Sequence, residues 1–330
     1  MGFAPKHDWA RLRIGRRGLL GALGFASAVI SLAGFGGSFA WWLEILSHFR
    51  VQYALCFLLL AALFAAGRKW RGAIGALAMA LVNAWPVLLF LLPPTPMAPA
   101  AGSSFRAMLM NVNCHRGDSS AVRAAISNAN PDLLVLEEIS DRWLDSLAPA
   151  LEAYPFRIFQ ARYDNFGIGL FSRRPFDSTH IAPFGLVDIP SVFAELRLEG
   201  RPLSLVATHP MPPGGALLAS ERNRHLEWMA NKIAALSGPV LLLGDLNTSP
   251  WSPVYRRFLE NSGLMDSAQG RSIRPTWPSS IPLLWLPLDH ALHSDGIAIH
   301  ARSVGPNIGS DHLPLIVDFS CTPPPRSVPD

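Results

Sequence analysis

Three long stretches without a charged side chain constrain this sequence more than any other feature. Residues 18–43, 51–67 and 72–105 contain no Asp, Glu, Lys or Arg. Over all 330 residues, 50% are hydrophobic and 16% are charged. This composition excludes disordered and collagen-like chains and is too apolar for an ordinary soluble protein. The chain therefore divides into an apolar first third and a more polar remainder.

The apolar first third is predicted to be a membrane anchor over residues 1–92. A helix needs about 20 apolar residues to cross a hydrocarbon core of ~30 Å. The uncharged stretches predict spanning helices at 18–40, 51–66 and 72–92. The middle segment is short for a span and also fits a buried core helix. The first also fits a secretory signal, because two arginines precede it and residues 38–40 have the small-x-small pattern of a cleavage site.

The distribution of Lys and Arg predicts how this anchor is oriented. Five of them precede the first segment and three lie in residues 67–71, whereas only Arg50 lies between the first two segments. Because cytoplasmic loops are enriched in Lys and Arg, the N-terminus and the 67–71 loop are expected in the cytoplasm. Three crossings then predict a multi-pass protein of the plasma or inner membrane with an extracytoplasmic C-terminal domain. Cleavage of the first segment leads to the same location.

The formal net charge of +4 does not indicate a nucleic-acid partner. Lys and Arg outnumber Asp and Glu by nine to two before Phe105, but Asp and Glu outnumber them by 22 to 19 from Phe105 onward. The basic surplus lies beside the apolar segments, where it is typical of a membrane protein. Residues 93–104 are predicted to form a Pro/Ala-rich tether that reaches less than ~40 Å, and residues 321–330 a Pro-rich tail.

From Phe105 onward, short apolar runs alternate with helical patterns, which predicts a layered α/β domain. The predicted strands are 107–112, 133–136, 169–172, 192–198, 203–208, 240–243, 289–292 and 313–319. The predicted helices are 119–128, 142–151 and 219–236.

Carboxylates and amides stand at the ends of three predicted strands. Asn111 ends the first, Glu138 follows the second, and Asp245 and Asn247 follow the run that begins at Val240. Oxygen ligands without cysteine suit Mg²⁺, Mn²⁺ or Ca²⁺ rather than zinc. Each residue taken singly also fits a turn former or a helix cap.

Taken together and in this order, the motifs of the C-terminal domain resemble the endonuclease/exonuclease/phosphatase superfamily, which has the deoxyribonuclease I-like fold. The matching elements are residues 111–113, 131–138, 167–173, 208–209, 244–247, 288–290 and 309–314. Gly-Asp-Leu-Asn at 244–247 and Ser-Asp-His-Leu-Pro at 310–314 are the most specific pair. The resemblance covers residues 105–320 and implies a four-layered α/β sandwich, in which two stacked β-sheets are flanked by helices and the site lies at one end.

The resemblance also implies a role for each matching residue. Asn111, Glu138 and Asp311 are expected to bind the metal, with Mg²⁺ as the expected cation and Mn²⁺ or Ca²⁺ as alternatives. The glutamate before this ligand, Glu137, departs from the family pattern, which more often has Gln there. Since successive residues of a regular strand face opposite ways, only one of the two glutamates is expected in the site, and Glu138 is the one that matches.

The remaining matches are expected to carry the catalysis. Asp245 and Asn247 correspond to the residues that activate water and orient the phosphate. His312 and Asp289 correspond to a histidine–carboxylate couple, in which the aspartate favours the charged imidazole. His209 corresponds to the histidine that faces the phosphate and assists the leaving oxygen.

Cysteine and the remaining histidines are expected to be structural. In the family, the first and last strands of the domain are antiparallel neighbours, so Cys114 and Cys321 are expected at opposite ends as free thiols, beyond the ~7 Å that a disulfide spans. The resemblance assigns no role to a further group of histidines, which are interpreted as surface or packing residues: His115, His290, His293 and His300.

The predicted function is a divalent-metal-dependent phosphoesterase that hydrolyses a phosphodiester or phosphomonoester by in-line attack of an Asp-activated water. The expected partners are a phosphate ester, which is a nucleic acid, a phospholipid or an inositol phosphate, and a lipid bilayer; no protein partner is predicted. The fold does not choose among these substrates. The uncharged segment 281–288 fits buried packing, which is favoured, or an apolar lip that enters lipid. The alternative function is a non-enzymatic, membrane-anchored binding module on the same fold.

Overall fold

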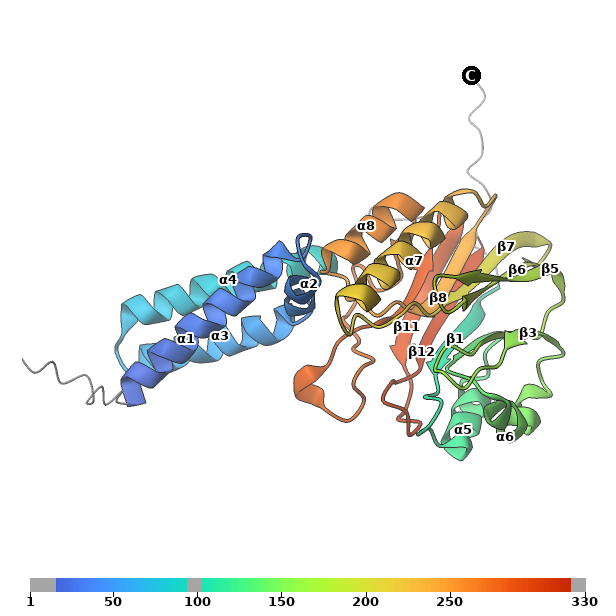
Figure 1. The fold of residues 1–330 in the computed structure, drawn as a ribbon, viewed down its shortest axis with the longest axis horizontal. Helices are drawn as coiled ribbons and strands as arrows, with labels where there is room; N and C mark the ends of the chain where they lie inside the picture. The colour runs from blue at the N-terminus through green and yellow to red at the C-terminus, as the bar shows by residue number, and fades with distance from the viewer. Residues whose placement is uncertain (1–15, 94–102, 322–330) are drawn as a thin grey trace, which may run out of the picture.

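The computed structural model describes residues 16–93 and 103–321, in which an elongated helical part projects from a layered α/β domain (Figure 1). The tether predicted at 93–104 and the tail predicted at 321–330 lie almost entirely outside the described residues.

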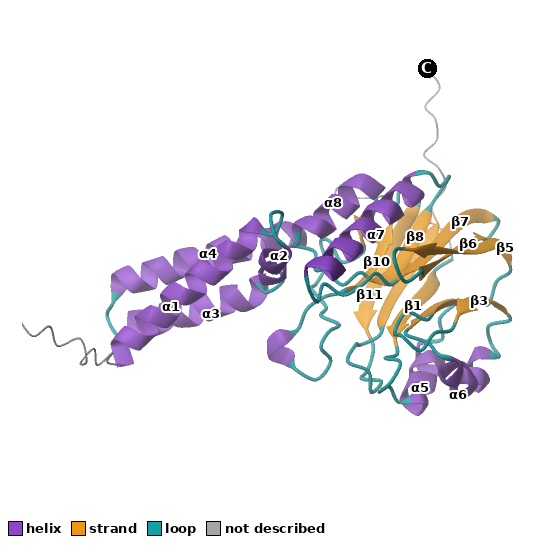
Figure 2. Ribbon diagram, in the orientation of Figure 1, coloured by secondary structure: helices purple, strands orange, loops and turns teal. Residues whose placement is uncertain are grey.

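Residues 16–93 of the helical part contain four α-helices, of which three lie side by side as a bundle (Figure 2). These three are α1 (Arg16–Ala33), α3 (Arg50–Ala66) and α4 (Trp70–Leu91), and the short α2 (Trp41–Ser47) lies where the bundle meets the α/β domain. Small and apolar side chains of α3 and α4 form the centre of the bundle, whereas many large apolar side chains point outward, such as Ile74, which is 68% exposed.

The three-span membrane bundle expected from composition is not confirmed. Helices form at all three predicted segments, but among the described residues only α4 is long and apolar enough to cross a membrane by itself. A second span requires Leu20–Gly36 and Trp41–Ser47 to count as one, although they are bent by 115°. Glycine at position 34 permits a close approach of α2 at this break, since a Cβ there would lie 3.0 Å from the backbone carbon of Leu46.

The α/β domain is built on two six-stranded sheets, with strand orders β11-β12-β1-β2-β4-β3 and β5-β6-β7-β8-β10-β9. The first sheet contains β1 (Phe105–Asn111), β2 (Leu133–Glu137), β3 (Phe156–Gln160), β4 (Ile168–Ser172), β11 (Ile297–Val304) and β12 (Leu315–Cys321). The second contains β5 (Phe176–Phe184), β6 (Ile189–Leu198), β7 (Arg201–Thr208), β8 (Val240–Asp245), β9 (Met265–Asp266) and β10 (Asp289–His293).

Two pairs of helices cover the outer faces of the sheets. They are α5 (Ser119–Ala129) and α6 (Asp141–Leu151) on the first sheet, and α7 (Ala216–Ala234) and α8 (Pro253–Ser262) on the second. Successive residues of β1 face two different cores. Ala107 and Leu109 pack between the sheets, while Met108 and Met110 pack against α5 and α6. The layered sandwich expected from the family resemblance is therefore confirmed.

The first and last strands of the domain are antiparallel neighbours, as expected. Phe105 pairs with Phe319, so the end of β1 that carries Asn111 lies away from Cys321. Cys114 and Cys321 are both free, which confirms that part of the prediction.

Candidate active site

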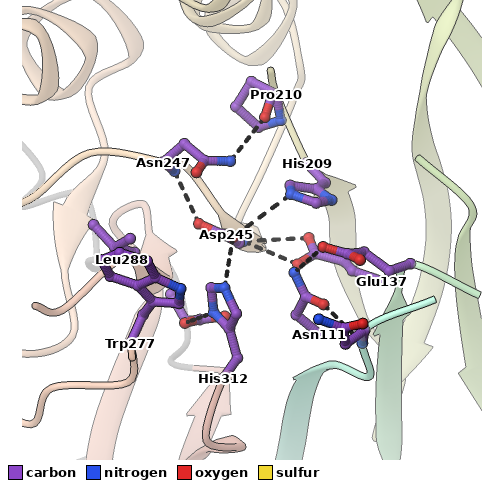
Figure 3. A network of polar contacts seen from close by, with 12 residues as sticks. Asn111, Glu137, His209, Pro210, Asp245, Asn247, Trp277, Leu288 and His312 are labelled. Atoms are coloured by element: carbon purple, nitrogen blue, oxygen red, sulfur yellow. Dashed lines mark hydrogen bonds and ion pairs between the residues drawn. The ribbon is translucent and has the colours of Figure 1, made fainter. Parts of the chain in front are cut away.

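Strand register brings four polar residues to the same end of the two sheets. Asn111 of β1 lies opposite Glu137 of the parallel strand β2, and Asp245 of β8 lies opposite Asp289 of the antiparallel strand β10. The two pairs meet between the sheets, because the backbone N–H of Asp245 donates to the carboxylate of Glu137 at 3.2 Å from each oxygen. Figure 3 shows this junction at the centre of a wider polar network.

His312 joins the two carboxylates of the second sheet. Its Nδ1 lies 2.8 Å from Oδ2 of Asp289, and its Nε2 lies 3.5 Å from Oδ2 of Asp245. All three side chains are buried. Burial by itself lowers the pKa of His312, but attraction first to Asp289 and then to Asp245 outweighs this effect and raises the pKa to about 10. The imidazole is therefore charged at neutral pH.

The pKa values of the two aspartates beside His312 are displaced in opposite directions. Burial would raise the pKa of Asp289, yet the charge and the hydrogen bond of His312 bring it below its ordinary value. For Asp245, burial prevails over the attraction of His312 and the pKa is raised. A pair of carboxylates with separated pKa values is the arrangement in which one holds a charge and the other exchanges a proton.

Glu137 is a residue of this centre that the sequence analysis excluded. It is fully buried, and burial, followed by repulsion from Asp245 and Asp289, raises its pKa well above the ordinary value. Both successive glutamates lie in the site, although only one was expected there. This is possible because Glu138 follows the end of the strand with a φ of 60° and turns toward the same site. Strand alternation gave the signal for Glu137: Leu133 and Val135 face the space between the sheets, and residue 137 continues that face.

Glu138 and Asn111 are in direct contact. The Nδ2 of Asn111 donates to Oε1 of Glu138 at 2.9 Å, and the backbone N–H of Cys114 donates to Oε2 at 3.2 Å. The third predicted metal ligand, Asp311, is held separately: its Oδ1 accepts from Nδ2 of Asn113 at 2.7 Å and its Oδ2 accepts from Nε1 of Trp277 at 3.1 Å.

His209 and Asn247 flank Asp245 on its other side. The Nε2 of His209 lies 3.5 Å from Oδ2 of Asp245, and its Nδ1 is a buried atom without a hydrogen-bond partner among the described residues. The backbone N–H of Asn247 donates to Oδ1 of Asp245 at 2.9 Å, and its Nδ2 donates to the carbonyl of Pro210 at 3.0 Å. Figure 3 shows the His209 ring directed at Asp245, whereas the side-chain amide of Asn247 is directed at Pro210.

Most of the predicted site residues line one cavity of about 530 Å³. Of the eight predicted site residues, Asn111 and Asp289 lie behind its wall, and the six that line it are Glu138, His209, Asp245, Asn247, Asp311 and His312. The wall also contains apolar side chains, among them Leu286 and Leu288 of the uncharged segment. The structure thus gathers predicted residues that are far apart in the sequence around a common hollow.

The uncharged segment 281–288 is buried only in part. Leu286 and Leu288 are buried, as the favoured packing interpretation expects, but Leu283 is 78% exposed and Trp285 is 39% exposed. The side chains of Leu283 and Trp285 are therefore exposed on the protein surface, on the segment that borders the cavity.

The donor atoms of the site fit a hard divalent cation. Ligand atoms of Asp245, Asp289 and His312 lie within 4.8 Å of one another. A cation bound by all three would compete with the hydrogen bond between His312 and Asp289. The carboxylates of Glu138 and Asp311 line the same cavity and offer the oxygen donors that Mg²⁺ prefers, and their hydrogen-bond partners are neutral N–H groups rather than a charged imidazole.

Solved structures of similar fold are each under 25% identical to this chain. An endonuclease/exonuclease/phosphatase from Beutenbergia cavernae is 20% identical, with a TM-score of 0.57, 68% of this chain covered and 74% of that one. D. rerio TDP2, complexed with a single strand DNA product, is 16% identical, with a TM-score of 0.55 and coverage of 66% and 100%. Sphingomyelinase C from Streptomyces griseocarneus is 17% identical, with a TM-score of 0.50 and coverage of 66% and 99%.

The sequence itself matches a known family. No curated protein matches the chain in a direct search. The model of the Endonuclease/Exonuclease/phosphatase family, however, matches residues 108–312, which is more than half of the chain and includes every predicted site residue. The chain therefore belongs to the endonuclease/exonuclease/phosphatase family.

Proposed function

We propose that the protein is a divalent-metal-dependent phosphoesterase that hydrolyses a phosphodiester or phosphomonoester by in-line attack of water. The observation that supports this function best is the buried group of Asp245, His312 and Asp289 at the wall of a cavity that also presents Glu138 and Asp311. A charged imidazole between two carboxylates of different proton affinity has the polarity needed to receive an anionic phosphate and to remove a proton from water.

In this proposal the predicted metal ligands are Asn111, Glu138 and Asp311. A cation held by them would neutralise charge that develops on the phosphate. Asn111 also fixes the rotamer of Glu138 through its hydrogen bond, and Asn113 fixes that of Asp311. Mg²⁺ suits these oxygen donors best, with Mn²⁺ or Ca²⁺ as alternatives.

Five further residues carry the proton transfers and the orientation of the phosphate. Asp245 accepts the proton of the attacking water, which its raised pKa favours. His312, held at Nδ1 by Asp289, donates from Nε2 to a phosphate oxygen. The amide of Asn247 orients the phosphate, and His209 assists the leaving oxygen from the opposite side of Asp245.

The enzyme and a non-enzymatic binding module are distinguished by hydrolysis of bis-p-nitrophenyl phosphate. We expect the purified full chain in detergent to hydrolyse this diester with Mg²⁺, to lose the activity with a chelator, and to recover it when Mg²⁺ is restored. His312→Ala should lower kcat by about 10²-fold or more. Equal rates for the wild type and His312→Ala would favour the binding module.

Membrane attachment is part of the proposal, with the bundle as a multi-pass anchor and the α/β domain extracytoplasmic. The large apolar side chains on the outside of the bundle support attachment, because few monomeric soluble proteins expose such surfaces. The Lys and Arg distribution around the helices supports the orientation.

A phospholipid is the substrate class that one specific observation favours. The exposed side chains of Leu283 and Trp285 lie on the segment whose next residues line the cavity, and the carbonyl of Trp285 accepts a hydrogen bond of 2.9 Å from Nε2 of Gln52 in α3. The lip is therefore attached to the helical part.

Trp285→Asp tests the lip. We expect this change to reduce hydrolysis of phospholipid in vesicles by about 10-fold while soluble bis-p-nitrophenyl phosphate is hydrolysed at the wild-type rate, because only a lipid substrate needs the lip to enter the bilayer. Unchanged rates on vesicles would remove the lip from the account. A screen of DNA, RNA and inositol phosphates with the same preparation covers the other substrate classes.

A further inference from the structure

The short helix α2 joins the α/β domain through a buried ion pair. Glu44 of α2 is 1% exposed and Arg222 of α7 is 0% exposed, and Nη2 of Arg222 donates to Oε2 of Glu44. The other oxygen, Oε1, accepts from the hydroxyl of Ser252 at 2.7 Å and from that of Thr248 at 3.3 Å. The carboxylate from the helical part thus accepts hydrogen bonds from three side chains of the α/β domain, and Nε2 of His48 lies 3.7 Å from its Oε1.

The same arginine holds the backbone of a proposed catalytic residue. Nη1 of Arg222 donates to the carbonyl of Asn247 at 2.6 Å. Asn247 has a φ of 51°, in the left-handed region that a non-glycine residue occupies only when its surroundings restrain it. Its N–H is bonded to Asp245, so its two backbone polar groups are tied to the carboxylate at the cavity and to the Arg222–Glu44 pair.

The helix also supplies part of the cavity wall. Ile45 of α2 lines the cavity with Asp245 and His312, and so do His48 and Phe49 of the turn that follows the helix. His48 is fixed there because its Nδ1 lies 2.8 Å from the hydroxyl of Ser249 and its carbonyl accepts from Nε1 of Trp251 at 2.7 Å. Figure 1 shows α2 at the junction of the bundle with the helices over the second sheet.

We propose that α2 is a component of the active site, in which Glu44 acts through Arg222 as a positioning residue for Asn247. A buried ion pair is weak support for stability, because removing both charges from water offsets much of their attraction. Its geometry here instead connects the helical part to one residue of the site. The inference rests on the proposed phosphoesterase function, and it implies that residues 105–320 alone form an incomplete site.

A double-mutant cycle on the full chain in detergent tests this role. Glu44→Gln combined with Arg222→Met removes both charges together, so that neither is left buried without a partner. We expect kcat on bis-p-nitrophenyl phosphate to fall by about 10²-fold, as misplacement of a catalytic group does, with KM changed less than about 3-fold. In the Asn247→Ala background the same pair of changes should lower kcat by less than about 3-fold.

Glu221→Ala is the matched control, because it removes an ion pair with Arg224 in the same helix, and Glu221 forms no side-chain hydrogen bond with residues 247–252 among the described residues. It should leave kcat within about 3-fold of the wild type. A merely structural pair would lower activity by equal factors in the wild-type background and in the Asn247→Ala background, and that result would overturn the proposal.

A second measurement does not depend on catalysis. Backbone amides between Leu246 and Ser252 should exchange hydrogen at least about 10-fold faster in the Glu44→Gln, Arg222→Met variant than in Glu221→Ala. Unchanged exchange would overturn the positioning role even if the protein hydrolysed no phosphate ester. Absence of hydrolysis by the wild type together with faster exchange would reject the proposed function and leave the positioning of Asn247 in place.

Discussion

At the scale of single residues, the pKa of His312 is the property that most directly connects structure with chemistry. Its folded pKa of about 10 is above the ordinary 6.5, so the charged imidazole stabilises the fold fully below about pH 6.5. This contribution is lost as the pH rises toward 10. A catalytic role for the charged form gives the rate the same alkaline limit.

Asp289→Asn should move that limit to lower pH. Asp289 is the residue that most strongly raises the pKa of His312, and an amide in its place removes the charge while keeping the shape. We expect kcat at neutral pH to fall by about 10²-fold or more and the alkaline limb of the pH–rate profile to shift toward neutrality. A profile that superimposes on the wild type would show that the couple does not act in turnover.

Glu137→Gln should preserve activity, in contrast to Glu137→Ala. The raised pKa of Glu137 favours its neutral acid, which Gln imitates, and the Gln carbonyl still accepts from the N–H of Asp245. Ala leaves that buried N–H without an acceptor, which should lower the free energy of unfolding by about 1–3 kcal/mol. Urea denaturation and kcat measured on both variants check this, and equal loss of activity in both would contradict a neutral Glu137.

At the scale of elements, the sequence predicted the inner strands of both sheets but not the edge strands. All eight predicted strands and all three predicted helices of the domain are present. The strands that were not predicted are β3, β5, β9 and β11, which are the four edges of the two sheets. Edge strands are partly exposed, as in Phe176–Phe184, so they lack the continuous apolar run that marks a strand buried on both faces.

The missed helix α8 has a different cause. Its sequence is polar and short, although Ser252 caps it by accepting from the N–H of Val254, and Gly263 ends it with a φ of 70°. These capping signals were present in the sequence. The site residues contributed by α2 could not be inferred, because Glu44 and Arg222 are 178 positions apart and only the tertiary contact relates them.

Gly244→Ala tests how closely β7 and β8 must approach to place Asp245. A Cβ at this position would lie 2.0 Å from the carbonyl oxygen of Thr208, which precedes His209. We expect the free energy of unfolding to fall by about 1–3 kcal/mol. The fall in kcat, expressed as an activation free energy, should exceed this loss of stability. Gly214→Ala is the control, because its nearest contact is a side-chain carbon at 3.5 Å. Equal behaviour of the two variants would contradict the close approach.

At the scale of the whole molecule, the helical part and the α/β domain meet close to the cavity. Besides the contacts of α2, the backbone N–H of Gly270 donates to the carbonyl of Phe90 near the end of α4 at 3.0 Å. Membrane attachment would therefore place the cavity near the bilayer surface, within reach of lipid headgroups.

The proposed orientation of the molecule is tested by thiol labelling in intact cells. Lys69→Cys and His300→Cys place a thiol on exposed positions of the loop between α3 and α4 and of the α/β domain, in a background where the native cysteines are replaced by Ser. A membrane-impermeant maleimide should label residue 300 before lysis and residue 69 only after lysis. The reverse pattern would place the α/β domain in the cytoplasm.

The central claim is that the cluster around Asp245 is a hydrolytic centre for phosphate esters, and the kcat of Asp245→Asn tests it most directly. The substitution preserves size and removes the proposed proton acceptor. With Mg²⁺ and bis-p-nitrophenyl phosphate, the account predicts that the wild-type rate exceeds that of the folded variant by about 10³-fold or more. A variant that turns over as fast as the wild type would contradict it.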